Sequence, residues 1–204
     1  AAAGFGAYLD ATLAGTGSHA LLAELNTLDA STLAAALTAL APDRYGVLAE
    51  DAFMAAFAHQ AMLDRQLALR RATPNGRGPG FFFEAGHRRA EYEAVSGLPA
   101  VETTAQRGTV GGVWRNQAFL LGATFTQETA DLDLDAAGSR AEIRRHTPAL
   151  FLQYAPDRFF VNVTAAFSRD EYELQRRIVY PGANLTALAR PDGRRTDLAL
   201  AAGY

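Results

Sequence analysis

The chain has 204 residues, a formal net charge of −3 and no cysteine, a size that suits one well-filled core or two modest units. The near-balanced charge gives no electrostatic reason to expect nucleic acid as a partner, and the lack of cysteine excludes disulfides and thiolate chemistry. Apolar residues make up 49% of the chain, but no segment approaches the ~18 consecutive apolar residues of a membrane helix. A membrane β-barrel is not excluded, because the apolar and polar residues of alternating strands average to a hydropathy near zero. The mean hydropathy of this chain is −0.05.

The first third of the chain is rich in Ala and Leu and is predicted to be helical. One candidate helix covers residues 20–28, and a second begins at Ser31, a plausible N-cap. A longer helix is predicted over about residues 43–71, with arginines in its last turns. At ~1.5 Å per residue it would reach about 40 Å, enough to cross a channel of membrane thickness. Taken alone, this segment is better explained as an ordinary amphipathic helix in a small bundle.

Residues 73–80 are dominated by Gly and Pro and form the strongest predicted boundary. After it, long segments alternate apolar and polar residues, as strands do. One face of these strands would carry Leu121, Phe125, Val161, Val163 and Leu200, and the other Gly122, Thr124, Asn162, Thr164 and Ala166. The predicted strands are 81–93, 105–115, 118–130, 141–154, 158–172 and 194–204.

The connections between these strands are predicted to alternate between tight turns and long loops. Tight turns are expected at 115–117 and 155–158, and long connections around 96–99, 135–139 and 181–193. This arrangement places all tight turns at one end, as in up-and-down outer-membrane barrels. The charged ends of the strands are expected to project into water: Arg88, Arg89, Glu91, Glu93, Glu128, Asp131, Asp133, Asp135, Glu142, Arg144, Arg145, Asp170, Glu171, Glu173, Arg176 and Arg177.

Aromatic residues gather near the tight turns and strand ends, which favours a girdle at a membrane interface over the general preference of aromatics for strands. The predicted girdle consists of Phe81, Phe82, Phe83, Trp114, Phe119, Tyr154, Phe159, Phe160 and Tyr204.

With these elements in place, the chain resembles the autotransporter translocator domains of type V secretion. The resemblance is carried by the order of the elements, and its segments are 33–45, 64–67, 81–86, 108–114, 119–125 and 196–204. It implies a mainly β fold with an N-terminal helical region: an antiparallel up-and-down transmembrane β-barrel preceded by a linker helix. It further implies an outer-membrane translocator and anchor in a Gram-negative bacterium that supports export and surface display of an upstream passenger.

The family's barrel has twelve strands, whereas six are predicted here. Because open strand edges are not tolerated in lipid, we expect an incomplete barrel, truncated near its middle. The expected divisions are 1–42, a helical tail of the passenger or junction; 43–80, the linker helix and Gly/Pro break; and 81–204, the N-terminal half of the barrel. The implied partners are outer-membrane lipid, the chain's own upstream passenger, the barrel-assembly machinery and periplasmic chaperones, with no nucleic acid.

No catalytic, cofactor-binding or metal-binding residue is predicted, and no cofactor. The histidines have no metal-ligand spacing and are expected to be exposed or capping: His19, His59, His87 and His146. The acidic run 131–135 lacks the pattern of a calcium loop. Gly76, Gly78 and Gly80 imitate a phosphate-binding loop only superficially, because no strand precedes them and no Lys-Ser/Thr pair follows.

Some autotransporters cut their linker helix at an Asn-Asn pair, which this sequence lacks. We therefore expect self-cleavage to be absent or to use other residues, and Glu50, Asp51 and Asp64 to face lumen arginines such as Arg88 or Arg115. Two other functions stay open. One is a soluble antiparallel β-barrel binding module with a helical subdomain. The weaker one is a fragment of a surface hydrolase whose catalytic part lies upstream.

Overall fold

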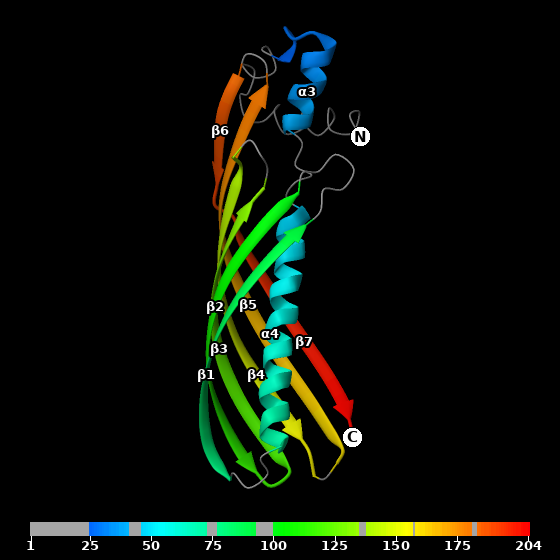
Figure 1. The fold of residues 1–204 in the computed structure, drawn as a ribbon, viewed down its shortest axis with the longest axis vertical. Helices are drawn as coiled ribbons and strands as arrows, with labels where there is room; N and C mark the ends of the chain where they lie inside the picture. Colours follow the sequence, from blue (N-terminus) through cyan, green and yellow to red (C-terminus); the bar gives the residue numbers. More distant parts are fainter. Residues whose placement is uncertain are drawn as a thin grey trace.

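The computed structural model describes residues 25–40, 46–72, 77–92, 100–134, 138–156, 158–180 and 183–204. Helices α3 (Ala30–Leu40) and α4 (Gly46–Ala72) precede a single seven-stranded antiparallel sheet (Figure 1). The strands are β1 (Gly78–Tyr92), β2 (Val101–Asn116), β3 (Phe119–Asp133), β4 (Arg140–Tyr154), β5 (Phe160–Tyr180), β6 (Ala183–Ala189) and β7 (Asp192–Gly203). The predicted long helix is confirmed from residue 46 and ends at residue 72. Residues 43–45 of that prediction and residues 20–24 of the first predicted helix lie outside the described residues.

Helix α3 is capped by Asp29 rather than by the predicted Ser31. One Asp29 carboxylate oxygen accepts the backbone N–H groups of Ser31 and Thr32, each at 3.0 Å. A carboxylate at this position binds the unpaired amides of the first turn. The Ser31 hydroxyl also donates to Asp29, and this bond is the first cause of a pKa well below the ordinary value for that carboxyl. Asp29 precedes Ser31 by two residues, and its carboxylate is a stronger acceptor than a hydroxyl.

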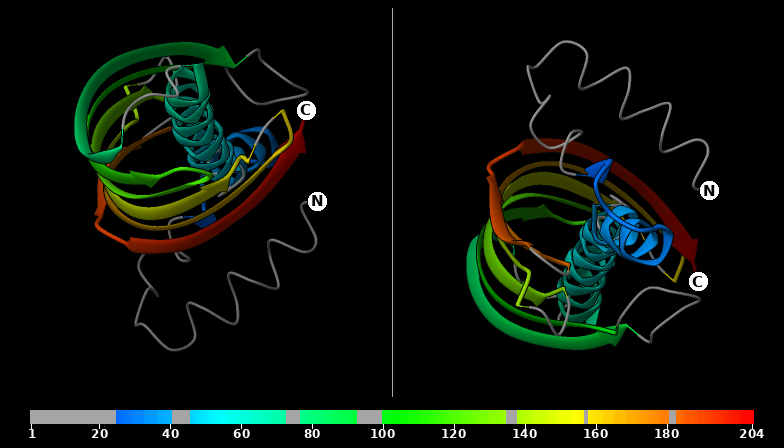
Figure 2. Two further views of the ribbon diagram at one scale, coloured as in Figure 1. Left: turned by 90° about the horizontal axis from the view of Figure 1, so that it is seen from below. Right: turned by 90° about the horizontal axis from the view of Figure 1, so that it is seen from above.

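The sheet curves around α4 as an open half-barrel. Strands β1 to β5 pair with their neighbours in chain order, and β6 and β7 both pair with β5. Viewed along the long axis, the strands form a trough with α4 on its concave side (Figure 2). Among the described strands, β1 pairs only with β2, and β7 only with β5, so closure of the sheet is not seen.

The two predicted tight turns are confirmed and lie together at one end, drawn at the bottom of Figure 1. The predicted long connection over 181–193 is wrong. Strand β5 continues to Tyr180, and β6 follows and pairs with its upper part. Strand β7 then pairs with the lower part of β5, so β6 and β7 act as one strand interrupted at Arg190 and Pro191. Proline lacks the N–H that a strand ladder requires, which accounts for the interruption.

The predicted division of the strand faces is confirmed. Leu121, Phe125, Val163 and Leu200 are exposed on the convex face, and Val161 is half-buried. The small and polar set on the concave face is buried: Gly122, Thr124, Asn162, Thr164 and Ala166. Most of the predicted aromatic girdle is also exposed on the convex side. Phe82 and Phe160 are exceptions, because they point to the concave side, where arginines of α4 cover their rings.

The concave face is more apolar than the small and polar residues predicted for it would indicate. Near the tight turns, Met62, Leu63 and Leu67 of α4 are fully buried against the sheet, in a cluster with Val113, Leu120, Ala149, Phe151 and Ala166. Near the other end, Val47 and Leu48 pack on a second apolar cluster that includes Leu132 and Ile143. Helix α3 covers Ile178 of β5 at the far tip. The apolar clusters therefore contain side chains of both the helices and the sheet.

Gly122 provides a test of this packing. A Cβ there would lie 2.2 Å from the Phe151 ring and 2.8 Å from the Gly112 carbonyl oxygen, whereas a Cβ at Gly108 would meet nothing within 4 Å. We expect Gly122→Ala to lower the free energy of unfolding by about 1–3 kcal/mol, the usual range for overpacking, and Gly108→Ala to change it little. The measurement is urea unfolding of detergent-folded protein, followed by the fluorescence of Trp114. Equal effects of the two substitutions would contradict this packing.

Candidate functional site

Helix α4 is bonded to the concave face along its whole length, and this interface is the candidate functional site. Its described polar and cation–π contacts reach strands β1, β2, β3, β4, β5 and β7. The strands approach the helix from around the trough, so groups distant in sequence meet on one helix. Asp51, for example, bonds residues 37 and 94 positions further along the chain.

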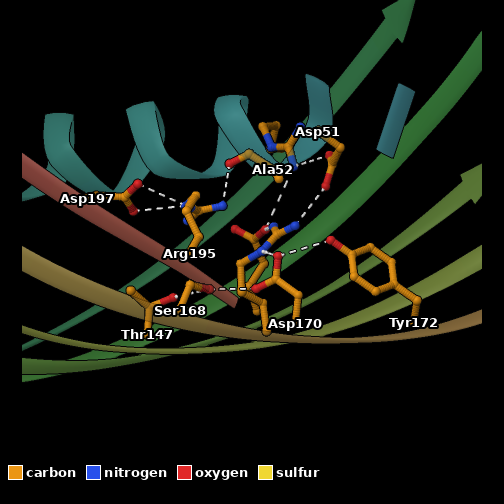
Figure 3. Close-up of polar contacts among 11 residues, drawn as sticks. Asp51, Ala52, Thr147, Ser168, Asp170, Tyr172, Arg195 and Asp197 are labelled. Atoms are coloured by element: carbon orange, nitrogen blue, oxygen red, sulfur yellow. Dashed lines mark hydrogen bonds and ion pairs between the residues drawn. The ribbon is translucent and has the colours of Figure 1, made fainter. Parts of the chain in front are cut away.

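A buried ion cluster joins α4 to the sheet near the upper part of the helix (Figure 3). Arg145 of β4 bonds Asp170 at 3.1 Å, Glu128 at 2.5 Å and Asp51 of α4 at 3.2 Å. Arg88 of β1 bonds the other oxygen of Asp51 at 2.6 Å. One helix carboxylate thus bridges two arginines from strands that are not neighbours in the sheet.

The cluster holds two guanidinium groups and three carboxylates, a formal excess of one negative charge. Neutral donors help to solvate this excess. Ser168 donates to Asp170 at 2.6 Å and Tyr172 donates to it at 3.2 Å, while Thr147 donates to Ser168. Hydrogen bonds to a carboxylate offset part of the cost of burying it.

The sequence-based expectation that all of these charges project into water is wrong for the centre of the cluster. Arg145, Glu128 and Asp170 are 2%, 5% and 3% exposed. They belong to the concave face, and the neighbouring Arg144 and Glu171 of the convex face are exposed as expected. Glu93 and Asp135 of the predicted set lie outside the described residues.

Next to the ion cluster, the helix backbone is also held. Arg195 of β7 donates to the Ala52 carbonyl oxygen at 2.6 Å and is itself oriented by Asp197 (Figure 3). Further along α4, His59 is buried and its Nδ1 lies 3.2 Å from the Thr126 hydroxyl. The expectation of an exposed or capping His59 is therefore wrong. His87 is exposed, His146 stacks on Phe125, and His19 lies outside the described residues.

At the tight-turn end, α4 is held by arginines and aromatic rings. Arg65 and Gln66 bond Glu84 of β1. The guanidinium of Arg70 lies 5.5 Å from the centre of the Phe82 ring, and that of Arg71 lies 3.9 Å from the centre of the Phe160 ring. Both distances are within the range of cation–π attraction.

The hypothesis that helix acids face lumen arginines is confirmed for Asp51 and Arg88. Asp64 instead accepts a hydrogen bond from Gln60 one turn earlier, and Glu50 is exposed. Arg115 donates to the backbone carbonyl of Arg70 rather than to a helix carboxylate. Within the described ranges, no group of three or more His, Asp or Glu side chains is arranged to hold a metal ion. In the same part of the chain, neither helix is long and apolar enough to span a bilayer.

The sheet is a meander whose outer face is apolar, and a long helix lies against its concave face, which carries the polar groups. This arrangement is that of a translocator-type β-domain. The Autotransporter beta-domain family matches residues 53–204. The chain belongs to this family, the outer-membrane β-domains of type V secretion in Gram-negative bacteria. No match is found among curated proteins.

The solved structures that are similar to the chain include two autotransporter domains. One is the translocator domain of the autotransporter NalP from Neisseria meningitidis, with a TM-score of 0.57 and 17% identity. The match covers 73% of this chain and 52% of the NalP domain, so the chain spans about half the length of that relative. The other is the β domain of the Bordetella autotransporter BrkA, with a TM-score of 0.42, 16% identity, and coverage of 59% of this chain and 47% of that one.

The charge excess of the ion cluster leads to an asymmetric prediction. Arg145→Gln leaves three carboxylates around one guanidinium, and we expect a loss of about 3–5 kcal/mol in the free energy of unfolding, as for other broken buried pairs. Asp51→Asn leaves two charges of each sign, so the loss should be smaller, about 1–3 kcal/mol. The measurement is urea unfolding of the detergent-folded variants.

The matched control is Arg144→Gln, one residue away on the exposed face, where Arg144 pairs with Glu142. Exposed pairs contribute only about 0–1 kcal/mol. A loss for Asp51→Asn as large as that for Arg145→Gln would show that the helix contact, rather than the charge excess, dominates the cluster.

Proposed function

We propose that this chain is the translocator and membrane anchor of an autotransporter, with α4 as the lumenal tail of an upstream passenger. The observation that carries the proposal is the distribution of apolar and polar side chains between the two faces of the sheet. Large apolar side chains such as Leu198 and Leu200 are 79% and 75% exposed on the convex face, while charged and polar groups are buried around α4. A soluble barrel has a polar outer face and an apolar interior. An apolar outer face that contacts lipid, with polar groups inside around a helix, is the reverse arrangement.

The topology supports the direction of transport in this proposal. Helix α4 ends at the tight-turn end, where β1 begins (Figure 1). Short turns in outer-membrane barrels lie on the periplasmic side. The N-terminal end of α4 then points toward the cell surface, where a passenger would be displayed.

In this proposal the chain carries out no catalytic step. Residues 1–42 are the passenger junction, residues 43–80 the linker segment and residues 81–204 the barrel segment. Because unpaired strand edges are not tolerated in hydrocarbon, β1 and β7 would pair with further strands in the membrane. Assembly would involve the barrel-assembly machinery and periplasmic chaperones. Self-cleavage is absent or uses residues other than an Asn-Asn pair, and a passenger released with a new terminus within residues 46–71 would contradict this.

A substitution on the convex face separates the membrane anchor from the soluble binding module. We expect Val163→Arg to lower the free energy of unfolding in bilayers by about 2–4 kcal/mol, the cost of an arginine at the lipid midplane. Gln175→Arg is the control, because Gln175 is exposed on the same face of β5 but among the charged residues near its end. In a soluble module the exposed Val163 would tolerate arginine as well as Gln175 does, and equal effects would support that alternative.

The secretion function is tested in a Gram-negative host. The chain, in its natural context, is expressed with an epitope before residue 25. We expect the epitope to be labelled on intact cells and the protein to fractionate with the outer membrane. Val163→Arg should reduce both signals, whereas Gln175→Arg should leave them near the wild-type level. An epitope that is labelled only after the cells are lysed would overturn the proposal.

A further inference from the structure

A small cationic pocket lies at the tight-turn end of the sheet, below the contacts that hold α4. It has a volume of about 110 Å³ and is lined by Arg70, Arg77, Gly78, Pro79, Gly80, Val113, Arg115 and Leu120. Three guanidinium groups thus surround an apolar floor, and none of the described residues that line the pocket is acidic. A single water needs only ~10–15 Å³, so the pocket has room for a larger ligand.

The arginines are held close together by the fold. Arg115 Nη1 donates to the carbonyl oxygen of Arg70 at 2.5 Å. Arg70 Nη1 lies so close to Gly80 that a Cβ there would be 3.1 Å away. Because like charges repel in a site with restricted access to water, such a group of arginines is stabilised by an anion.

The cationic excess is not neutralised by the described carboxylates. Within the described residues, no ion pair joins Arg70, Arg71 or Arg77 to an acidic side chain. Arg70 Nε and Arg71 Nη1 are buried without a hydrogen-bond partner in that part of the chain. These N–H groups are donors without an acceptor among the described residues.

The dipole of α4 explains only part of this arrangement. The C-terminal end of a helix is equivalent to about −0.5 of an elementary charge, which Arg70 and Arg71 more than offset. Arg77 comes from outside the helix, before β1, and adds positive charge beyond that of the helix end. Arg115 of β2 adds another, although it also donates to the Arg70 carbonyl oxygen.

We propose that this pocket binds a phosphate-type oxyanion through Arg70, Arg77 and Arg115. A guanidinium presents its N–H donors in a fork that matches two oxygens of such an anion. The recognition comes from side chains, unlike that of the phosphate loop that Gly76, Gly78 and Gly80 superficially imitate. The anion is either free phosphate or the phosphate of a lipid headgroup that reaches around the strand ends. Exposed Phe81 and Trp114 lie on the opposite, convex face of the same strand ends, where aromatics mark the level of a membrane interface.

Inorganic phosphate is the first probe, titrated calorimetrically into the detergent-folded chain. We expect binding that weakens at least about tenfold in Arg77→Gln and in Arg115→Gln, since each removes charge-assisted bonds. Arg158→Gln is the matched control, because Arg158 is exposed at the same end of the sheet and does not line the pocket. If circular dichroism shows that Arg115→Gln does not fold, the exposed Arg77 carries the test.

Nanodiscs of phosphatidylglycerol are the second probe, with bound lipid counted by native mass spectrometry after transfer to detergent. Lipid retained by the wild-type chain and lost from Arg77→Gln identifies a headgroup, whereas phosphate binding without retained lipid identifies a free anion. The proposal is overturned if neither probe binds, or if Arg158→Gln weakens binding as much as Arg77→Gln. Phosphate binding requires no passenger export, so failure of this inference is distinguishable from failure of the secretion test.

Discussion

The structure depends on one constraint: a curved sheet with an apolar convex face needs its concave face filled, and α4 fills it. Met62, Leu63 and Leu67 are each no more than 1% exposed, although they lie on a helix that also carries a buried carboxylate. Close packing inside proteins leaves little room for voids. The small residues at Gly122 and Ala166 and the large ones at Phe151 and Leu120 are therefore matched to the helix as much as to each other.

The buried ion cluster fixes the position of the helix more than it stabilises the contact between helix and sheet. Buried pairs often contribute little net stability, because desolvation offsets their attraction. Asp51, however, can satisfy Arg88 and Arg145 at one axial position only. A shift of α4 by one turn, about 5.4 Å, would leave these arginines without their helix partner and expose a carboxylate to the apolar clusters on either side. The cluster sets the depth of the helix, and the apolar contacts hold it there.

The strands and their faces could be predicted because a period of two is a local property, visible at Leu121 and Gly122 without knowledge of neighbours. The burial of Arg145, Glu128 and Asp170 could not be read from charge, since Arg144 and Glu171 beside them are exposed. The signal that could have shown it is the alternation of side chains along the strand. Arg145 lies on the same face as Ile143 and Thr147, which are both buried. Strand β6 was missed because the prolines at 181 and 191 resemble loop boundaries, although residues 183–187 between them alternate apolar and polar side chains.

The parallel course of α4 and the strands has a mechanical consequence. A load on the N-terminal end of the helix would act along the sheet, so the contacts from Asp51 to Arg71 would be sheared together rather than opened one after another. The ion cluster and the Arg195 bond to Ala52 lie nearest to that end and would carry part of this shared load. Apolar side chains and the arginine–aromatic pairs follow behind them. Whatever precedes residue 46 is therefore tethered to the sheet by contacts arranged in parallel.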